Sequence, residues 1–232
     1  LILVGYLGFV AIKSSEERSV WVGMARETAH QMGTPLTSLM GWVELLSEKP
    51  DDPQIPIEMQ QDIERLKDVA ERFNRIGSTS STKLISLNST IESAVDYIRH
   101  RLPQLSRGEV KIILNLPPDF TANANRHLLG WVFENLLRNG VEALHGDGGA
   151  ISVEGKVRGK RIIVDVKDQG VGISRRHWRD IFRPGYSTKK RGWGLGLSLA
   201  KRIIEDVHKG RIFVHESRVD RGTIIRVQLI GR

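Results

Sequence analysis

The sequence predicts an α+β protein in which an N-terminal helical hairpin precedes an α/β sandwich. Between residues 22 and 73, apolar side chains recur at alternating spacings of three and four, a pattern typical of helices packed in a bundle. After residue 82, short β-rich runs alternate with helical stretches, which favours one mixed sheet covered by a layer of helices. The chain of 232 residues is long enough for two small domains with real cores.

The first twelve residues, LILVGYLGFVAI, are apolar throughout, and Lys13 and Arg18 follow them. A membrane span needs roughly 20 apolar residues, so this run alone is too short. With positive charges after it, the run suggests the cytoplasmic end of a truncated transmembrane helix; the alternative is a buried or coiled-coil N-terminus. We therefore assign residues 1–13 to the membrane-proximal end of a span and expect a membrane anchor before residue 13.

A helical hairpin is predicted over residues 14–77, because two apolar seams flank a segment that contains two prolines. The first seam consists of Val22, Ala25, Ala29, Met32, Leu36, Leu39, Val43 and Leu46. The second consists of Met59, Ile63, Leu66, Ala70 and Phe73. Pro50 and Pro53 break the helix between them. One hairpin cannot bury both seams, whereas two hairpins close a four-helix bundle, so we predict a homodimer through residues 14–76.

A polar segment, GSTSST at residues 77–82, indicates a linker, which we place at residues 78–83. The second domain then covers residues 84–232. Its predicted strands are Lys83–Leu87, Val110–Leu116, Ile151–Val157, Arg161–Val166, Arg211–Glu216 and Thr223–Leu229. Its predicted helices lie near residues 89–102, 125–144 and 195–208.

Positive charge is concentrated in the last third of the chain. Residues 150–232 contain 20 Lys and Arg against 8 Asp and Glu, a net charge of +12, whereas residues 1–149 carry about −4. No nucleic-acid-binding motif accompanies this charge, so we expect an anionic ligand or an anionic membrane and no nucleic acid. The chain has no cysteine, which excludes a disulfide framework, a thiolate zinc site and a cysteine nucleophile.

Two asparagines in the predicted helix near residues 125–144 form the first candidate site. Asn135 and Asn139 are four residues apart, so both side chains face the same side of the helix. Asparagine is a poor helix former, so two copies on one face need a reason beyond helix stability. Amide oxygens suit a Mg²⁺ ion shared with phosphates; capping or solvated asparagines are the alternative.

The second motif is Asp168-Gln169-Gly170-Val171-Gly172, which follows a predicted strand. A carboxylate there can accept a hydrogen bond from an exocyclic amine such as that of adenine, and glycines let a ring lie against the backbone. An ordinary turn would explain the same residues.

The third motif is Gly192-Trp193-Gly194-Leu195-Gly196-Leu197 at the start of the last predicted helix. Glycine-rich backbone at a helix N-terminus offers unpaired N–H groups to phosphates. The spacing matches neither the Rossmann nor the P-loop fingerprint. The preceding segment PGYSTKKR, residues 184–191, suggests a basic lid whose Lys189 and Arg191 bind phosphates; a solvated charge run is the alternative.

With His30 in the segment AHQMGTPL upstream, the order of these motifs resembles that of a sensor histidine kinase of a two-component system. The resemblance covers roughly residues 14–230. It implies a dimerisation and histidine-phosphotransfer hairpin joined to a catalytic ATP-binding domain of the GHKL (Bergerat) type. It further implies ATP and Mg²⁺ as cofactors, a response regulator as partner, and the bacterial inner membrane as location, with this region facing the cytoplasm.

The resemblance also implies a role for each matching residue. His30 looks like the autophosphorylated histidine, and Thr34 like the residue that positions water for dephosphorylating the response regulator. Asn139 looks like the magnesium ligand, and Asn135 would lie beside the phosphates or the attacking group. Asp168 looks like the adenine-reading carboxylate, supported by Gly170 and Gly172. The phosphate-binding segment comprises Gly192, Gly194, Gly196 and Leu197, with Lys189 and Arg191 of the lid.

One position departs from the family pattern. Many members have Glu or Asp directly after the histidine as general base, whereas this chain has Gln31, which cannot accept a proton. Glu27 lies three residues before His30 on the same helical face, and we hypothesise that it takes the orienting or basic role. The alternative is that no base is needed, because an imidazole with a pKa of about 6.5 is largely neutral at pH 7.

Three other functions remain compatible with the motifs: an ATPase of the same nucleotide fold, a serine/threonine kinase on that fold, or a dimerising module with a degenerate pocket. A simple ATPase would need a general-base glutamate where this chain has Asn135. The complete asparagine and glycine motifs favour a working kinase over the degenerate module.

Overall fold

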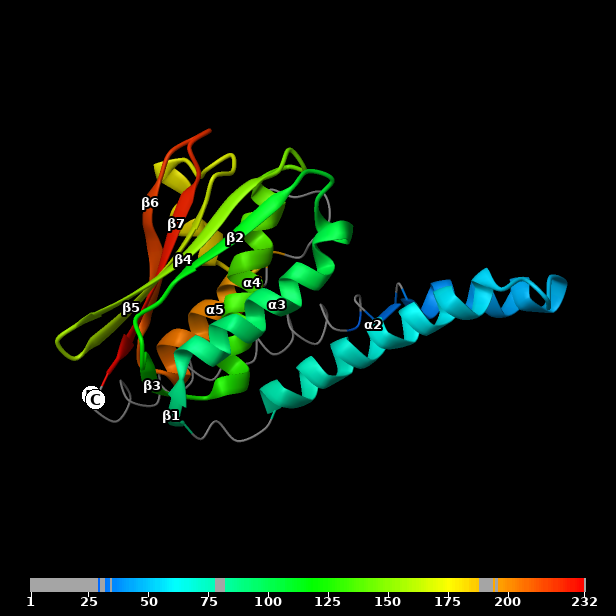
Figure 1. Ribbon diagram of the computed structural model, residues 1–232, viewed down its shortest axis with the longest axis horizontal. Coiled ribbons are helices and arrows are strands. Elements are labelled where there is room, and N and C mark those ends of the chain that lie inside the picture. Colours follow the sequence, from blue (N-terminus) through cyan, green and yellow to red (C-terminus); the bar gives the residue numbers. More distant parts are fainter. Residues whose placement is uncertain are drawn as a thin grey trace, which may run out of the picture. The chain divides into compact units, whose positions relative to one another are not determined.

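The computed structural model describes residues 29, 32–33, 35–77, 82–187, 194 and 196–231 (Figure 1). The chain divides into two compact units, one ending at Ser78 and the other beginning at Thr79. The predicted membrane segment, residues 1–13, lies outside the described residues. Within the described ranges, no helix is both long enough and apolar enough to cross a membrane.

The first unit contains a helical hairpin, as the two seams predict. Helical residues 35–48 are followed by a turn and by helix α2, Gln54–Gly77. The backbone N–H of Gln54 donates to Asp52 Oδ1 (2.9 Å), which helps to begin α2. Trp42 Nε1 donates to Asp62 Oδ2 (3.2 Å), and Asp62 is only 2% exposed. This partly buried hydrogen bond fixes the two helices against each other.

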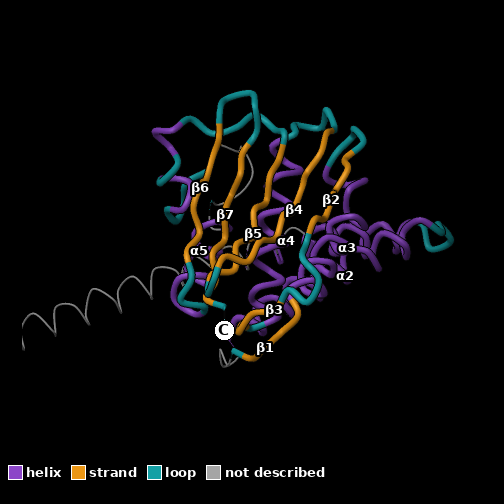
Figure 2. The backbone as a smooth tube through the Cα atoms, turned by 60° about the vertical axis from the view of Figure 1, so that its left-hand side comes forward, coloured by secondary structure: helices purple, strands orange, loops and turns teal. Residues whose placement is uncertain are grey.

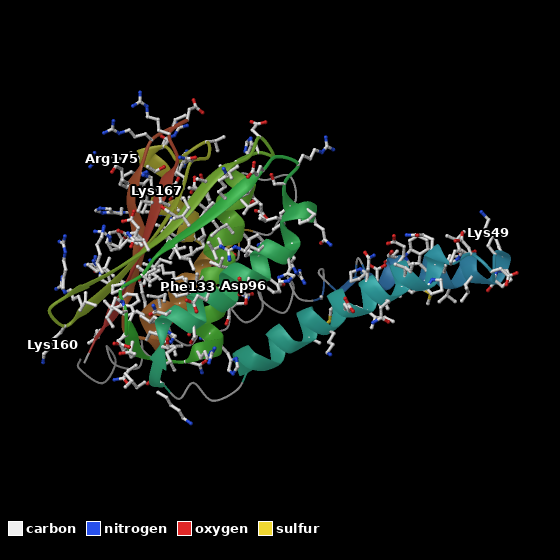
Figure 3. All side chains as sticks on the ribbon, viewed as in Figure 1. Lys49, Asp96, Phe133, Lys160, Lys167 and Arg175 are labelled. Atoms are coloured by element: carbon white, nitrogen blue, oxygen red, sulfur yellow. The ribbon has the colours of Figure 1, made fainter. Side chains whose placement is uncertain are left out.

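The second unit contains a five-stranded sheet in the order β2-β4-β5-β7-β6 (Figure 2). The strands are β2 Val110–Asn115, β4 Gly149–Arg158, β5 Arg161–Asp168, β6 Arg211–Ser217 and β7 Thr223–Ile230. β2 and β4 run parallel, and the other three neighbouring pairs are antiparallel. β4 and β5 are joined by a tight hairpin, whose tip carries Lys160 (Figure 3). The mixed sheet of the sequence prediction is therefore confirmed.

Three helices form a layer on one face of this sheet (Figures 1 and 2). They are α3 Leu87–Leu105, α4 Arg126–Ala143 and α5 Gly196–Arg202, the last continuing as a π-helical turn over Ile203–Val207. Alternate residues of β4, β5 and β7 point toward the helices, so Ile151, Val164 and Val227 are fully buried with Phe133 of α4. Burial of each such side chain contributes about 1.5–3 kcal/mol to folding.

The prediction of a single sheet is wrong for the residues at the start of this unit. β1, Lys83–Ser86, pairs with β3, Thr121–Ala124, in a separate antiparallel two-stranded sheet. β3 has the sequence TANA, whose small side chains give no strand signal, so it was not predicted. Leu87 belongs to α3 rather than to a strand, because Ser86 caps that helix by accepting a hydrogen bond from the backbone N–H of Ser89.

A buried histidine connects the ends of two helices in this layer. Asn125 caps α4 through its side-chain oxygen, and its backbone N–H donates to His208 Nε2 (3.0 Å). The other ring nitrogen, Nδ1, lies 2.8 Å from the carbonyl oxygen of Ile203, so the neutral ring donates there. His208 is 6% exposed, and this burial lowers the pKa of its imidazole below the ordinary value, although the Ile203 carbonyl acts in the opposite direction.

Replacement of His208 by Gln should therefore have a pH-dependent effect on stability. Gln can accept from the Asn125 N–H but loses the bond to Ile203, so at pH 7.5 we expect the free energy of unfolding to fall by about 1 kcal/mol. A histidine whose pKa is lowered on folding stabilises the fold above about pH 6.5 and loses that contribution as the pH falls. The difference between wild type and variant should thus shrink from pH 7 to pH 5.

Urea unfolding followed by far-UV circular dichroism at several pH values measures this difference. His127→Gln, at an exposed position in the first turn of α4, is the control and should leave stability unchanged. A wild-type-to-variant difference for His208 that stays constant between pH 7.5 and pH 5 would contradict the assignment of a buried, neutral imidazole.

Candidate functional site

Asn135 lies on α4 with its side chain turned into the interior, where it is only 3% exposed. Its Oδ1 accepts a hydrogen bond from Arg138 Nη2 (3.0 Å). Its Nδ2 is buried and has no hydrogen-bond partner among the described residues. Buried amides are normally paired, and an unmet donor costs about 1–3 kcal/mol, so the free N–H₂ group indicates a place for a ligand.

The amide of Asn135 lies against Gly196, the first residue of α5. A Cβ atom at Gly196 would be 2.5 Å from Asn135 Oδ1 and 3.0 Å from Nδ2, distances that no side chain tolerates without movement. The absence of a side chain at Gly196 therefore lets the start of α5 approach the asparagine helix. The asparagine motif and the glycine motif, which are about 60 residues apart in the sequence, meet at this contact.

Asp168 is the last residue of β5 and is 8% exposed. The backbone N–H of Gly170 donates to its Oδ1 (2.9 Å). Burial raises the pKa of the Asp168 carboxyl above its ordinary value, although hydrogen bonds from the backbone of Gly170 and Thr223 counter part of this rise. The carboxyl is thus held in place, at a low-dielectric position, by its own loop.

The loop after Asp168 packs against the C-terminal part of α4. A Cβ at Gly140 of α4 would be 3.4 Å from Asp168 Cβ, and one at Gly170 would overlap the carbonyl of Ala143. Val171 N–H donates to that same carbonyl oxygen (3.1 Å). Gly172 has a φ of 68°, a left-handed conformation that favours glycine, and packs against the backbone of Arg218.

Gly194 lies next to the segment that the sequence predicts as a lid. A Cβ at Gly194 would overlap the backbone of Tyr186. The rings of His177 and Tyr186 lie against each other at a tilt, with centroids 5.8 Å apart, and Asp180 forms an ion pair with Arg183 (3.1 Å). The part of the lid before residue 188 is therefore tied to the short helical turns Arg175–His177 and Asp180–Phe182.

Other predicted site residues lie outside the part of the chain that the structure describes. In the hairpin these are Glu27, His30, Gln31 and Thr34; in the lid and the glycine motif they are Lys189, Arg191 and Gly192. Leu197 is described and lies in α5, and Asn139 is half-buried on α4, four residues after Asn135.

Residues 124–230, which contain this site, match the family described as histidine kinase-, DNA gyrase B- and HSP90-like ATPases. Sporulation kinase D of Bacillus subtilis is 29% identical over 89% of this chain and 41% of its own length. Sensor histidine kinase ZraS of Salmonella typhimurium is 31% identical over 94% of this chain and 48% of its own length. Over most of its length the chain is therefore similar to proteins named as sensor histidine kinases, and residues 124–230 match the ATPase family.

Solved histidine kinases share the fold. Histidine kinase ThkA, in its complex with the response regulator protein TrrA, superimposes with a TM-score of 0.62 at 22% identity, over 94% of this chain and 64% of that chain. This likeness confirms the sandwich fold predicted from the sequence. The chain spans half or less of the length of the first curated relatives that it matches, which are sporulation kinases C, D and E and nitrogen regulation protein NtrY.

Two residues of this site were not predicted from the sequence. Arg138 lies between the two asparagines in the sequence and donates a hydrogen bond to Asn135 Oδ1. It was not predicted because a charged residue in a helix is usually a solvated side chain. Gly140 directly follows Asn139 and lets α4 approach Asp168 and Ile151. A glycine within a helical pattern was the available signal, because such a residue costs stability unless close packing requires it.

Gly196→Ala tests the contact between the asparagine motif and the glycine motif. The added methyl group should displace Asn135 or the start of α5, and we expect a loss of about 1–3 kcal/mol in the free energy of unfolding. Gly130→Ala is the matched control, because a Cβ there would meet nothing closer than Thr90 Cγ2 at 3.9 Å. The control should be neutral or stabilising by up to about 1 kcal/mol. Equal stabilities of the two variants in urea unfolding would contradict the close contact.

Proposed function

We propose that this chain is the kinase region of a sensor histidine kinase, which transfers the γ-phosphoryl group of ATP to His30. One observation carries the proposal: the three nucleotide motifs meet on α4. Asn135 contacts Gly196, Gly140 contacts Asp168, and Ala143 contacts Gly170. The site therefore has a carboxylate near the C-terminal end of α4 and a glycine-rich backbone at the middle of the helix, which suits adenine at the first position and phosphates at the second.

The residues present fit ATP. Asp168 is positioned to accept a hydrogen bond from the exocyclic amine of adenine, because its loop already holds the carboxyl in place. The unpaired Nδ2 of Asn135 is a donor without an acceptor among the described residues, which a phosphate oxygen would supply. Gly194, Gly196 and Leu197 would line the phosphates, joined by Gly192, Lys189 and Arg191.

Mg²⁺ would be held by Asn139 together with the phosphates. Its amide oxygen is a hard donor of the kind that Mg²⁺ prefers, and its half-buried place on α4, one turn from Asn135, supports this assignment. When bound, the ion neutralises negative charge on the phosphates during transfer.

The reaction is a phosphoryl transfer to a nitrogen. A ring nitrogen of His30 forms a bond to the γ-phosphorus, the bond between that phosphorus and the bridging oxygen breaks, and ADP leaves with the electron pair. The proton on the other nitrogen of the attacking imidazole passes to Glu27 or, in the alternative, to solvent. Transfer of this kind depends mainly on positioning and charge stabilisation, so Gln31 is compatible with it.

A response regulator receiver domain is the proposed next acceptor, through an aspartate, with Thr34 acting in the reverse dephosphorylation. The crystal structure of ThkA with response regulator protein TrrA supports this partner by similarity. We further propose that residues 1–13 belong to a membrane anchor and 14–77 to the phosphotransfer domain. Residues 78–83 would be the linker and 84–232 the catalytic domain, facing the cytoplasm at the bacterial inner membrane.

The hairpin exposes apolar side chains that a second copy of the chain would cover. Leu36 and Val43 of the first seam are both 53% exposed, and Ile63 of the second seam is 48% exposed. Met40 and Ile57 add to this apolar surface, at 68% and 52% exposed. Pairing with an identical hairpin buries such surface in a four-helix bundle, which supports the homodimer predicted from the seams.

Incubation of the purified chain with γ-labelled ATP tests the proposed activity. We expect label on the wild type and none on His30→Ala, while His30→Ala still binds nucleotide. The bond to nitrogen should be acid-labile and base-stable, so acid-stable label would indicate a serine/threonine kinase instead. His127→Ala, at an exposed histidine of the catalytic domain, is the control and should be labelled like the wild type.

Two further variants separate nucleotide binding from phosphoryl transfer in the same labelling assay. Asp168→Asn should lose nucleotide binding and hence labelling, yet be at least as stable as the wild type at neutral pH, because burial disfavours the charged carboxyl. Glu27→Gln should bind nucleotide normally and be labelled more slowly; unchanged labelling would exclude a role for Glu27.

Val43→Glu should convert the proposed dimer into monomers. A carboxylate brought into the bundle interior without a partner costs several kcal/mol, which is enough to dissociate a dimer at micromolar concentration. Ile113→Glu on β2 is the matched control, since Ile113 is 54% exposed and lies outside the hairpin. Light scattering after size exclusion gives the masses, and a dimeric Val43→Glu variant would place the interface elsewhere.

A further inference from the structure

Arg138 donates a hydrogen bond to the oxygen of the Asn135 amide and leaves the amide nitrogen without a partner among the described residues. Arg138 Nη2 donates to Asn135 Oδ1 at 3.0 Å, whereas Nδ2 has no hydrogen-bond partner among the described residues. A guanidinium group only donates hydrogen bonds, so it can meet the oxygen of the amide but not its nitrogen. Rotating the amide by 180° would set two donors against each other.

A second contact holds the guanidinium group in place. Arg138 Nε lies 3.9 Å from Glu142 Oε1, one turn further along α4, and the two side chains are 36% and 32% exposed. Asn135, Arg138 and Glu142 are spaced three and four apart, so they share one face of the helix. The partial burial of the pair reduces screening by solvent and limits the freedom of the arginine.

We propose that Arg138 is a positioning residue that fixes the amide of Asn135 with its N–H₂ group directed to the phosphates of the nucleotide. This inference rests on the proposed function, since it concerns the same site. The two asparagines then have different roles, because Asn135 offers a donor to a phosphate oxygen while Asn139 offers its oxygen to Mg²⁺. Without Arg138, the amide of Asn135 is free to present its carbonyl, which repels a phosphate.

Arg138→Met removes the donor and keeps most of the side-chain volume. We expect the affinity for a non-hydrolysable ATP analogue to fall about tenfold in calorimetric titration of the full chain with Mg²⁺. The affinity for adenosine, which has no phosphate, should be unchanged. A merely structural role of Arg138 would weaken both ligands alike.

Arg99→Met on α3 is the matched control. Arg99 also forms an ion pair with a carboxylate on its own helix, Asp96 (3.3 Å), and donates to a carbonyl, that of Ile112 (3.2 Å). It does so outside the nucleotide motifs, so its replacement should leave the affinity for the ATP analogue unchanged.

A double variant shows whether Arg138 acts through Asn135. If it does, Asn135→Ala with Arg138→Met should bind the ATP analogue no more weakly than Asn135→Ala alone. Additive losses would show that the guanidinium group contacts the phosphates directly, and equal losses for adenosine would show a structural role; either result overturns the inference. A wild type that binds no nucleotide would overturn the proposed function and this inference with it, whereas failure of the Arg138 variants alone leaves the proposed function standing.

Discussion

The close approach of α4 to its neighbours is the constraint on which the rest of the second unit depends. Three contacts define it: Asn135 against Gly196, Gly140 against Asp168 and Ile151, and Ala143 against Gly170. At each contact a glycine on one side removes the Cβ that would hold the two backbones apart. Because these contacts lie along one helix, a small displacement of α4 would move the carboxylate, the amide and the glycine-rich backbone relative to one another.

The ends of α4 are held by interactions that serve this constraint. At its start, Asn125 caps the helix with its side chain and donates its backbone N–H to the buried His208, which follows the π-helical turn of α5. At its end, the carbonyl of Ala143 accepts from Val171 N–H in the loop after Asp168. The helix that carries the asparagines is therefore anchored both to the segment after the glycine motif and to the loop after the aspartate.

Periodicity was sufficient to predict the large elements, and the side-chain chemistry of the asparagine, aspartate and glycine motifs led to the predicted site. The five strands of the main sheet and its helices follow from runs of β-branched residues and from helical spacing, because burial on one or two faces imposes those patterns. β3 was missed because TANA has no apolar side chain larger than alanine, and its pairing with β1 depends on residues far along the chain. Arg138 was missed because its partner, the oxygen of Asn135, is held in place by the contact with Gly196, which is about 60 residues away in the sequence.

The site retains two features that a protein selected for stability alone would remove. Asn135 keeps a buried N–H₂ group without a partner among the described residues, and Asp168 keeps a carboxyl whose burial disfavours its charged form. Each costs free energy in the unliganded fold, and leucine and asparagine, respectively, would avoid the cost. Both groups lie where the glycine contacts bring motifs together, one a donor and the other an acceptor. A nucleotide, the proposed ligand, would supply the complementary acceptor at its phosphates and the complementary donor at its base, so one ligand would offset both costs.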